Sequence, residues 1–129
     1  MTKISELLLA APDINAEIFR SEIAPKLVEM QQARKTIFAS SEDLALRASK
    51  IVHGFRRVGE TLGGVFTFPG IDTVIVSEAA PLARAFGHSY VFDSTVVLND
   101  IQETLVWHRT GVGSRRSLGT PPNNYWDLR

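Results

Sequence analysis

Short apolar runs and longer segments of helical period alternate along the chain. Residues 4–11, 36–39 and 71–76 are nearly continuous apolar runs, each bounded by turn residues or by a change of period. Runs of this length are typical of strands that are buried on both faces of a parallel sheet. Pro12 ends the first run, because proline lacks the N–H that a continuing element would use.

A segment with helical features follows each predicted strand. After the first strand, Asp13 or Asn15 can cap a helix, and Pro25 predicts a break or kink in it. After the second strand, a helix ends at Gly54, a residue type that favours the position just past a helix end. Its apolar face consists of Leu44, Ala48, Ile51 and Val52. The third helix extends from about Ser94 to Gly111, and one face holds Val97, Ile101, Thr104, Leu105 and His108.

This order of elements predicts an α/β fold, with a short parallel sheet of about three strands and flanking helices. We assign residues 1–111 to this unit. Residues 112–129 are rich in Gly, Ser, Pro and Asn, and we expect an extended tail that only Tyr125, Trp126 and Leu128 could dock. Residues 54–70 form a glycine-rich excursion, for which a lid and a plain loop both stay open.

Composition narrows the classes of function. The 129 residues suit one domain, and 14 basic residues balance 14 acidic ones, so charge gives no reason to expect a nucleic-acid partner. The absence of cysteine excludes disulfides and thiolate metal sites, and the three histidines lack metal-ligand spacing. We therefore expect no metal or cofactor. Without a signal-peptide pattern or a membrane-spanning run, the sequence predicts a cytoplasmic protein.

The candidate chemistry lies just beyond the predicted strands, where ligands bind in parallel α/β sheets. Asp13, Asp43 and His88 all occupy such positions. A carboxylate fixes the tautomer of a histidine and stabilises its protonated form, and the imidazole then serves as general base to a nucleophile. Asp43 and His88 match the last two members of the order nucleophile, acid, histidine that α/β-hydrolases use.

Structural explanations compete with these roles. Asp43 could stabilise the first turn of its helix, and His88 could be a polar residue of a strand-end loop. Ser89 follows Gly87 as in a G-x-S-x-G elbow, but Val91 stands where the tight turn needs a small residue. Asp13 and Asp72 are expected to hold strand-end loops by hydrogen bonds to the backbone.

Six motifs in fixed order resemble the C-terminal part of a bacterial α/β-hydrolase family, esterase- or lipase-like proteins mostly of uncharacterised substrate. The resemblance covers roughly residues 7–107, and Tyr125-Trp126 is similar to the ending of that family. The motifs are Ala11-Pro12-Asp13-Ile14, Ala39-Ser40-Ser41-Glu42-Asp43-Leu44-Ala45-Leu46, Ser49-Lys50-Ile51-Val52-His53-Gly54, Arg57-Val58-Gly59, Gly70-Ile71-Asp72-Thr73 and Gly87-His88-Ser89-Tyr90.

The resemblance implies a serine ester hydrolase that acts on an ester, acyl or lipid-like small molecule without a cofactor. It makes Asp43 the triad acid and His88 the triad histidine, on the last three strands of the hydrolase sheet. Complete members have further strands upstream, with the serine elbow and the oxyanion loop, and this sequence contains no G-x-S-x-G. Two alternatives stay open. One is a non-catalytic oligomeric α/β binding or assembly module derived from a hydrolase, and the other is catalysis rebuilt within an oligomer with a local serine such as Ser89.

The strand order of the family would leave residues 4–11 as an open apolar edge of the sheet. Exposed apolar edges pair with other chains. We therefore expect either a homo-oligomer across this edge or assembly with a complementary N-terminal half.

Overall fold

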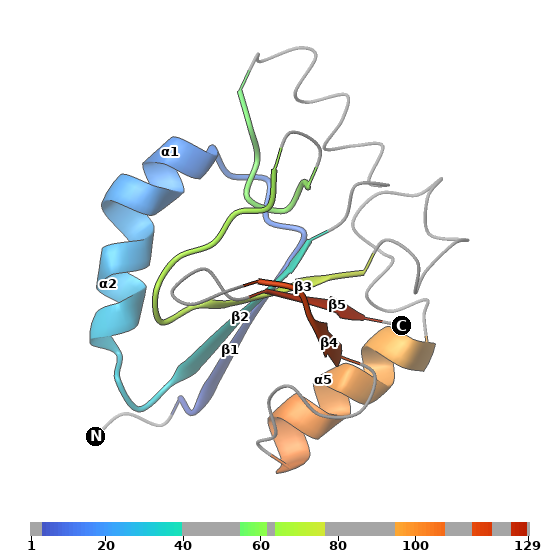
Figure 1. Ribbon diagram of the computed structural model, residues 1–129. Helices are drawn as coiled ribbons and strands as arrows, with labels where there is room; N and C mark the ends of the chain where they lie inside the picture. The colour runs from blue at the N-terminus through green and yellow to red at the C-terminus, as the bar shows by residue number, and fades with distance from the viewer. Residues whose placement is uncertain are drawn as a thin grey trace.

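Six stretches of the chain, residues 4–39, 55–61, 64–76, 95–107, 115–119 and 125–128, are described by the computed structural model. They contain one five-stranded sheet in the order β1-β2-β3-β5-β4 (Figure 1). The strands are β1 (Glu6–Ala10), β2 (Arg34–Ala39), β3 (Asp72–Ile75), β4 (Arg115–Ser117) and β5 (Tyr125–Leu128). Strands β1, β2, β3 and β5 are parallel, and β4 pairs antiparallel with β5. The predicted α/β fold class is confirmed.

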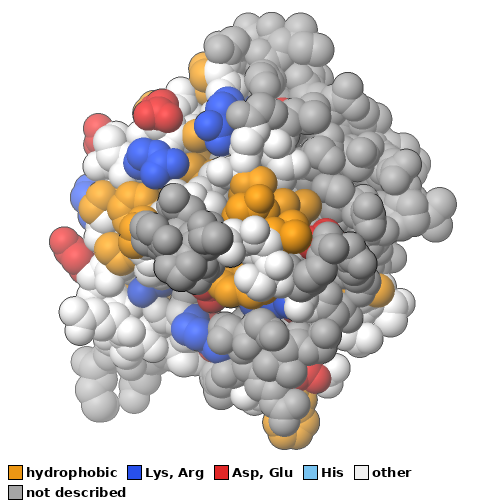
Figure 2. Space-filling view, in the orientation of Figure 1, with side chains coloured by type: hydrophobic (Ala, Val, Ile, Leu, Met, Phe, Trp, Pro, Cys, Tyr) orange, Lys and Arg blue, Asp and Glu red, His pale blue; other side chains and the backbone are white. Residues whose placement is uncertain are grey.

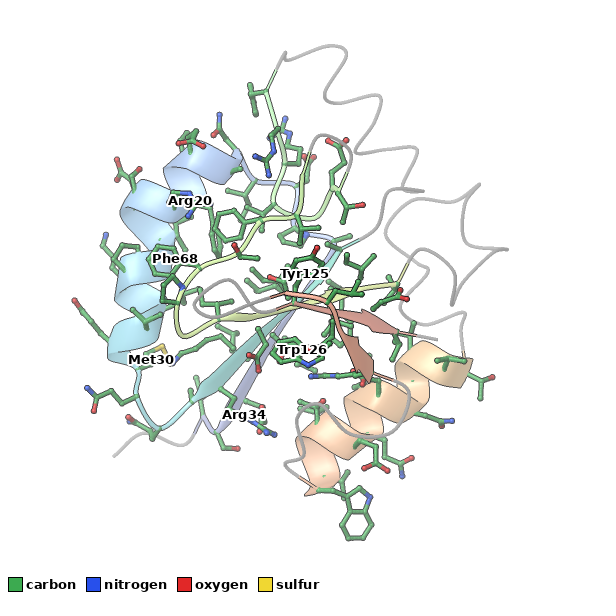
Figure 3. All side chains as sticks on the ribbon, in the orientation of Figure 1. Arg20, Met30, Arg34, Phe68, Tyr125 and Trp126 are labelled. Carbon is green, nitrogen blue, oxygen red and sulfur yellow. The ribbon has the colours of Figure 1, made fainter. Side chains whose placement is uncertain are left out.

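The three strands predicted from the apolar runs are present and are neighbours in chain order. The sheet is wider than predicted, because β5 and β4 continue it beyond β3. Figure 3 shows Tyr125 and Trp126 on β5 in the middle of the molecule. Arg115 and Asp127 interrupt the apolar pattern of these two strands, so their sequence does not resemble a buried strand. The division of the chain at residue 111 stays a prediction.

Apolar side chains cover both faces of the sheet, because successive residues of a strand point to opposite sides. Leu8 of β1 and Phe38 of β2 belong to one core cluster, together with Val97 of α5 (Thr95–Trp107). Leu9 and Ile37, their neighbours in sequence, belong to the cluster on the opposite face. Figure 1 shows the helices on the two sides of the sheet accordingly. Strand β2 is buried on both faces, whereas β1 is only partly buried.

The first helical segment is continuous from α1 (Ala16–Ile18) through the π-helical turn η1 (Phe19–Ile23) to α2 (Ala24–Glu29). The cap is Asn15, whose side chain accepts hydrogen bonds from the backbone N–H groups of Glu17 and Ile18. Pro25 cannot donate to the carbonyl four residues earlier, and the wider turn of η1 changes the hydrogen-bond register there. The predicted break is therefore a π-turn within an unbroken helix.

Residues 64–68 are anchored to the body of the fold. Phe66 is fully buried and meets Phe19 edge to face, with ring centroids 5.3 Å apart. Arg20 lies over the same ring and donates to the carbonyl of Thr67, and the Thr73 hydroxyl donates to the carbonyl of Phe66. Figure 3 shows Arg20 and Phe68 side by side at the first helix. This part of the glycine-rich excursion is core, and its attachment explains the aromatic residues in it.

Helix α5 covers the opposite face with a different set of residues from the predicted one. Val97 and Thr104 are buried and Ile101 is partly buried, as expected. Leu105 is 46 % exposed, so its assignment to the buried face was wrong. Asp100 is buried in its place. A carboxylate turns toward the sheet here because β4 supplies it with a partner, which is described below.

Candidate functional site

The carboxyl ends of three parallel strands meet at one edge of the sheet. The N–H of Ala11 donates to the carbonyl of Phe38 at 2.9 Å, and the N–H of Val76 donates to the carbonyl of Ala39 at 3.0 Å. The chain leaves β2 and β3 at this edge. Asp43 and His88 follow within residues 40–54 and 77–94, which lie outside the described residues. Their placement stays a prediction, but the segments that carry them start from adjacent strands.

The turn that ends β1 has an unusual backbone. Ala11 has a φ of 44°, in the left-handed region that non-glycine residues rarely occupy. Gly59 packs directly on this turn, and a Cβ there would lie 2.5 Å from the carbonyl carbon of Ala11 and 2.7 Å from the nitrogen of Pro12. Only glycine allows this approach. The two backbones are held in contact at the edge where the strands end.

A second segment lies along the chain that leaves β1. The N–H of Ala16 donates to the carbonyl of Arg56, that of Val58 to Ile14, and that of Gly59 to Pro12, at distances between 2.9 and 3.0 Å. Residues 12–16 and 56–59 therefore form a short paired structure, which we call the wall. The wall stands at the carboxyl edge of β1.

Charged side chains hold the wall together. Nε of Arg57 lies 2.9 Å from Oδ1 of Asp13, and the guanidinium stacks over the ring of Phe55 at 4.2 Å. The side chain of Arg57 is only 10 % exposed, while that of Asp13 is 47 % exposed. Asp13 was expected to accept hydrogen bonds from the backbone of the loop after the first strand. It does lie at the end of β1, but its carboxylate pairs with the side chain of Arg57. This ion pair gives the carboxylate of Asp13 a structural role in the wall.

Glu60 is the least expected residue of this edge. It directly follows Gly59, and only 1 % of its surface is exposed. Burying a carboxylate is costly unless neighbouring groups compensate it, so the position is highly constrained. The sequence carries no signal for this burial, because a glutamate in a glycine-rich segment normally faces water.

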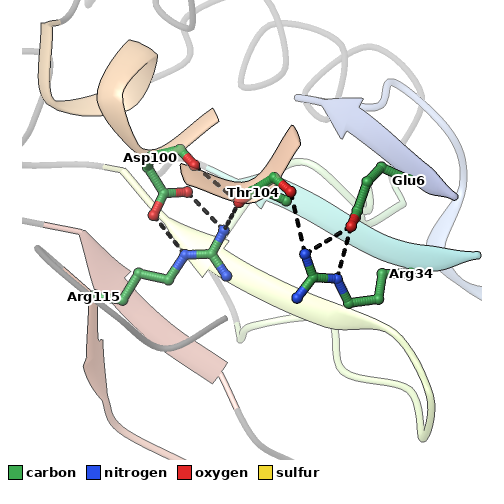
Figure 4. Close-up of polar contacts among 5 residues, drawn as sticks. All are labelled: Glu6, Arg34, Asp100, Thr104 and Arg115. Carbon is green, nitrogen blue, oxygen red and sulfur yellow. Dashed lines mark hydrogen bonds and ion pairs between the residues drawn. The ribbon is translucent and has the colours of Figure 1, made fainter. Parts of the chain in front are cut away.

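A buried polar network lies between α5 and β4 (Figure 4). Arg115 of β4 binds Asp100 of α5 with two parallel hydrogen bonds, Nε to Oδ1 at 2.6 Å and Nη2 to Oδ2 at 2.7 Å. Nη2 also donates to the hydroxyl of Thr104 at 2.9 Å, and that hydroxyl donates to the carbonyl of Asp100. The side chains of Arg115 and Asp100 are 1 % and 4 % exposed. We call these three residues the α5 clamp.

A second ion pair lies beside the α5 clamp. Arg34 of β2 donates through Nε and Nη2 to Oε1 of Glu6 on β1, at 2.9 and 2.7 Å. It also donates to the backbone carbonyl of Thr104 at 3.2 Å. Burial raises the pKa of Asp72 on β3, although the charges of Arg115 and Arg34 lower it; the charge of Glu6 raises it further. Desolvation is the largest of these effects, so Asp72 is a carboxylate in an unfavourable position.

The described surface shows mixed chemistry. Basic, acidic and apolar side chains are interspersed on the face in Figure 2. Within the described stretches, no three or more His, Cys, Asp or Glu side chains gather as metal ligands would. No helix among these stretches is long and apolar enough to cross a membrane.

Comparison with known proteins bears on the first half of the chain. The model of a family described as alpha/beta hydrolase of unknown function (DUF900) matches residues 1–65. The matched part includes β1, the first helix, β2 and the wall. No curated protein and no solved structure matches the chain. The resemblance read from the motifs is confirmed at the level of the family.

The raised pKa of Asp72 predicts the pH dependence of one substitution. Burial raises the pKa of this carboxyl in the folded protein above its usual value, so ionisation destabilises the folded state at neutral pH. This cost disappears as the pH falls below the unfolded pKa. Asp72→Asn should therefore raise the melting temperature at pH 7, by an amount that shrinks toward zero near pH 3. Thermal melts across this range measure it.

The control for this series is Asp13→Asn, at the half-exposed carboxylate of the wall. It removes an attractive pair with Arg57, so it should lower or leave unchanged the melting temperature at pH 7. A lower melting temperature for Asp72→Asn at neutral pH would contradict the dominance of desolvation.

Proposed function

The chain belongs to the alpha/beta hydrolase family of unknown function (DUF900), and on that premise we propose that it carries the acid and the histidine of a serine ester hydrolase. Asp43 is the acid and His88 is the general base. The substrate is a small ester or acyl compound, and the reaction uses no cofactor. We place the activity in the cytoplasm.

The observation that supports this assignment best is the shared edge of β2 and β3. Val76 and Ala39 are joined by a backbone hydrogen bond, so the segments with Asp43 and His88 leave the sheet from adjacent points. An acid and a histidine that follow neighbouring strands can reach each other over the edge of the sheet. The wall stands at the end of β1, where Asp13 pairs with Arg57.

The proposed mechanism is acyl transfer in two halves. His88 removes the proton of a serine hydroxyl as the hydroxyl attacks the ester carbonyl, and the protonated imidazole then donates to the leaving alcohol. Asp43 holds the imidazole in the right tautomer and stabilises its charge. Water, deprotonated by the same histidine, then cleaves the acyl-serine bond and releases the acid.

The serine is proposed to come from a polypeptide beside β1. The sequence contains no G-x-S-x-G, and β1 is the terminal strand of the described sheet. Leu7, Leu8 and Leu9 of this strand are only partly buried. Another strand at this edge would complete the burial, and a parallel one would end beside the wall. A complementary N-terminal half would supply both the additional strand and the serine. A second copy of the chain would pair with the edge of β1 but would not supply an elbow serine.

A second candidate function rests on the same edge. A chain with a free apolar strand and no elbow motif can serve as a non-catalytic oligomeric binding or assembly module derived from a hydrolase. Rebuilt catalysis with Ser89 is the remaining arrangement, in which the nucleophile would stand next to His88 in sequence.

Ester turnover distinguishes these candidates. We expect hydrolysis of a short-chain p-nitrophenyl ester, alone or with the complementary half, to fall by about 10³- to 10⁴-fold in His88→Ala and Asp43→Asn. His53→Ala is the control and should retain the rate. A fluorophosphonate probe identifies the activated serine directly. Absence of turnover and of labelling under both conditions would leave the assembly module as the function.

The free edge generates a separate prediction. The carbonyl of Ser5 and the N–H of Ala11 form hydrogen bonds with β2. Backbone groups of successive residues in a strand point to opposite sides, so the N–H of residue 10 points away from β2. Ala10→Pro therefore removes an outward donor and leaves the pairing of β1 with β2 intact. Light scattering should give a mass above 14.3 kDa for the unchanged chain and the monomer mass for Ala10→Pro. Ala10→Ser keeps the donor and should associate; a monodisperse unchanged monomer would refute pairing at this edge.

A further inference from the structure

Helix α5 runs antiparallel to the strands that it covers. Near its start, Val97 belongs to the core cluster that contains Ala11 and Val76, which follow the carboxyl ends of β1 and β3. Near its end, the carbonyl of Thr104 accepts a hydrogen bond from Arg34, the first residue of β2. The first turns of α5 therefore lie over the carboxyl ends of the strands, and its last turns lie over their amino ends.

The two flanks of α5 face opposite edges of the sheet. Asp100 binds Arg115 of β4, so the flank with Asp100 is the one that faces β4. Successive residues of a helix are rotated by roughly 100°, which places Leu98, Ile101 and Leu105 on the other flank. Because β1 and β4 are the two terminal strands of the described sheet, this second flank faces the β1 edge. We call these three residues the α5 stripe.

The α5 stripe is apolar and incompletely covered. Leu98 is 43 % exposed and Leu105 is 46 % exposed. Ile101 packs against the same core cluster as Leu8 of β1, and both side chains are only partly buried. The stripe and the leucine of the terminal strand therefore border one apolar surface, which continues to the free edge of β1.

We propose that a second copy of this chain binds this surface, with the two β1 strands paired antiparallel about a two-fold axis and the two α5 stripes in contact. A two-fold axis perpendicular to the sheet makes the paired strands antiparallel and keeps both helices on the same face of the continuous sheet. Each copy then covers the apolar surface of the other. The proposal uses the free edge of β1 and does not depend on Asp43 or His88.

The α5 stripe is self-complementary in shape and charge. Leu98 and Leu105 lie three residues before and four residues after Ile101, so in an antiparallel pair the Leu98 of one copy lies opposite the Leu105 of the other. The charged residues of α5 are Asp100 and Glu103, and both lie on the flank that faces away from the stripe. A second copy therefore brings no like charges of α5 together. The formal net charge of zero adds no overall repulsion between copies.

Lysine substitutions on the intact 129-residue chain test the role of the stripe. In Leu105→Lys or Leu98→Lys, two ammonium groups would enter the apolar contact, so the dissociation constant of the dimer should rise by about tenfold or more. Val106→Lys is the matched control. Val106 is 56 % exposed, and its rotation from Leu105 directs it away from both the sheet and the stripe. Sedimentation over a concentration series measures each dissociation constant, and circular dichroism verifies the fold.

The expected result is a dimer of twice 14.3 kDa for the unchanged chain and for Val106→Lys, with weaker association in the two stripe variants. Equal dissociation constants in all four proteins would overturn the proposal, and so would a monomeric unchanged chain or an equal loss in Val106→Lys. If Leu105→Lys does not fold, Leu98→Lys carries the same comparison. Ester hydrolysis is not the readout, so failure of the proposed function leaves this result unaffected.

Introduced cysteines test the antiparallel arrangement. The natural sequence contains no cysteine, so a single introduced thiol reports only contacts between copies. An equal mixture of Leu98→Cys and Leu105→Cys should form a disulfide-linked dimer in air faster than either variant alone. Faster linkage in one of the variants alone would indicate a different alignment of the helices and would contradict the two-fold arrangement.

Discussion

Burial of both faces of a parallel sheet is the constraint on which this fold depends. Backbone groups of β2 and β3 are satisfied within the sheet by neighbours on both sides, but the side chains of these strands need cover on two faces. The first helix and residues 64–68 cover one face, and α5 covers the other. Because the helix connections lie on the faces, the strand ends are left free to carry polar residues. Among the described residues, β1 is the terminal strand of the sheet, and its leucines are only partly buried.

Polar residues at the carboxyl edge of β1 and polar residues beneath α5 stabilise different parts of the fold. At the carboxyl edge, the wall keeps the chain beyond β1 in place through Gly59 and the pairing of Asp13 with Arg57. Between α5 and the sheet, the α5 clamp and the pair of Arg34 with Glu6 tie helix and strands together. Breaking a buried pair such as that of Arg115 with Asp100 leaves an uncompensated charge, at a cost of about 3–5 kcal/mol. The described ion pairs thus stabilise the wall, the pairing of β1 with β2 and the packing of α5 on the sheet.

The sequence predicts those parts of the fold that local pattern controls. Three apolar runs identify three strands, and Asn15 is one of the two caps considered. Strands β4 and β5 were not predicted, because their pairing depends on contacts between residues that are far apart in the sequence. In β4, the charged Arg115 also interrupts the apolar pattern by which a buried strand is recognised. The burial of Asp100 in place of Leu105 depends on that same arginine. The assignment of Asp43 and His88 rests on motifs and strand ends and stays a prediction, and no periodicity could reveal Glu60 or the α5 clamp.

The central claim is that Asp43 and His88 act as a pair at the carboxyl edge of this sheet. The most direct measurement is the pKa of His88, obtained by NMR titration of the unchanged chain and of Asp43→Asn. A carboxylate beside the imidazole stabilises its protonated form, so the account predicts a pKa above the ordinary value that falls by about one unit in Asp43→Asn. An ordinary pKa that is the same in both proteins would contradict it.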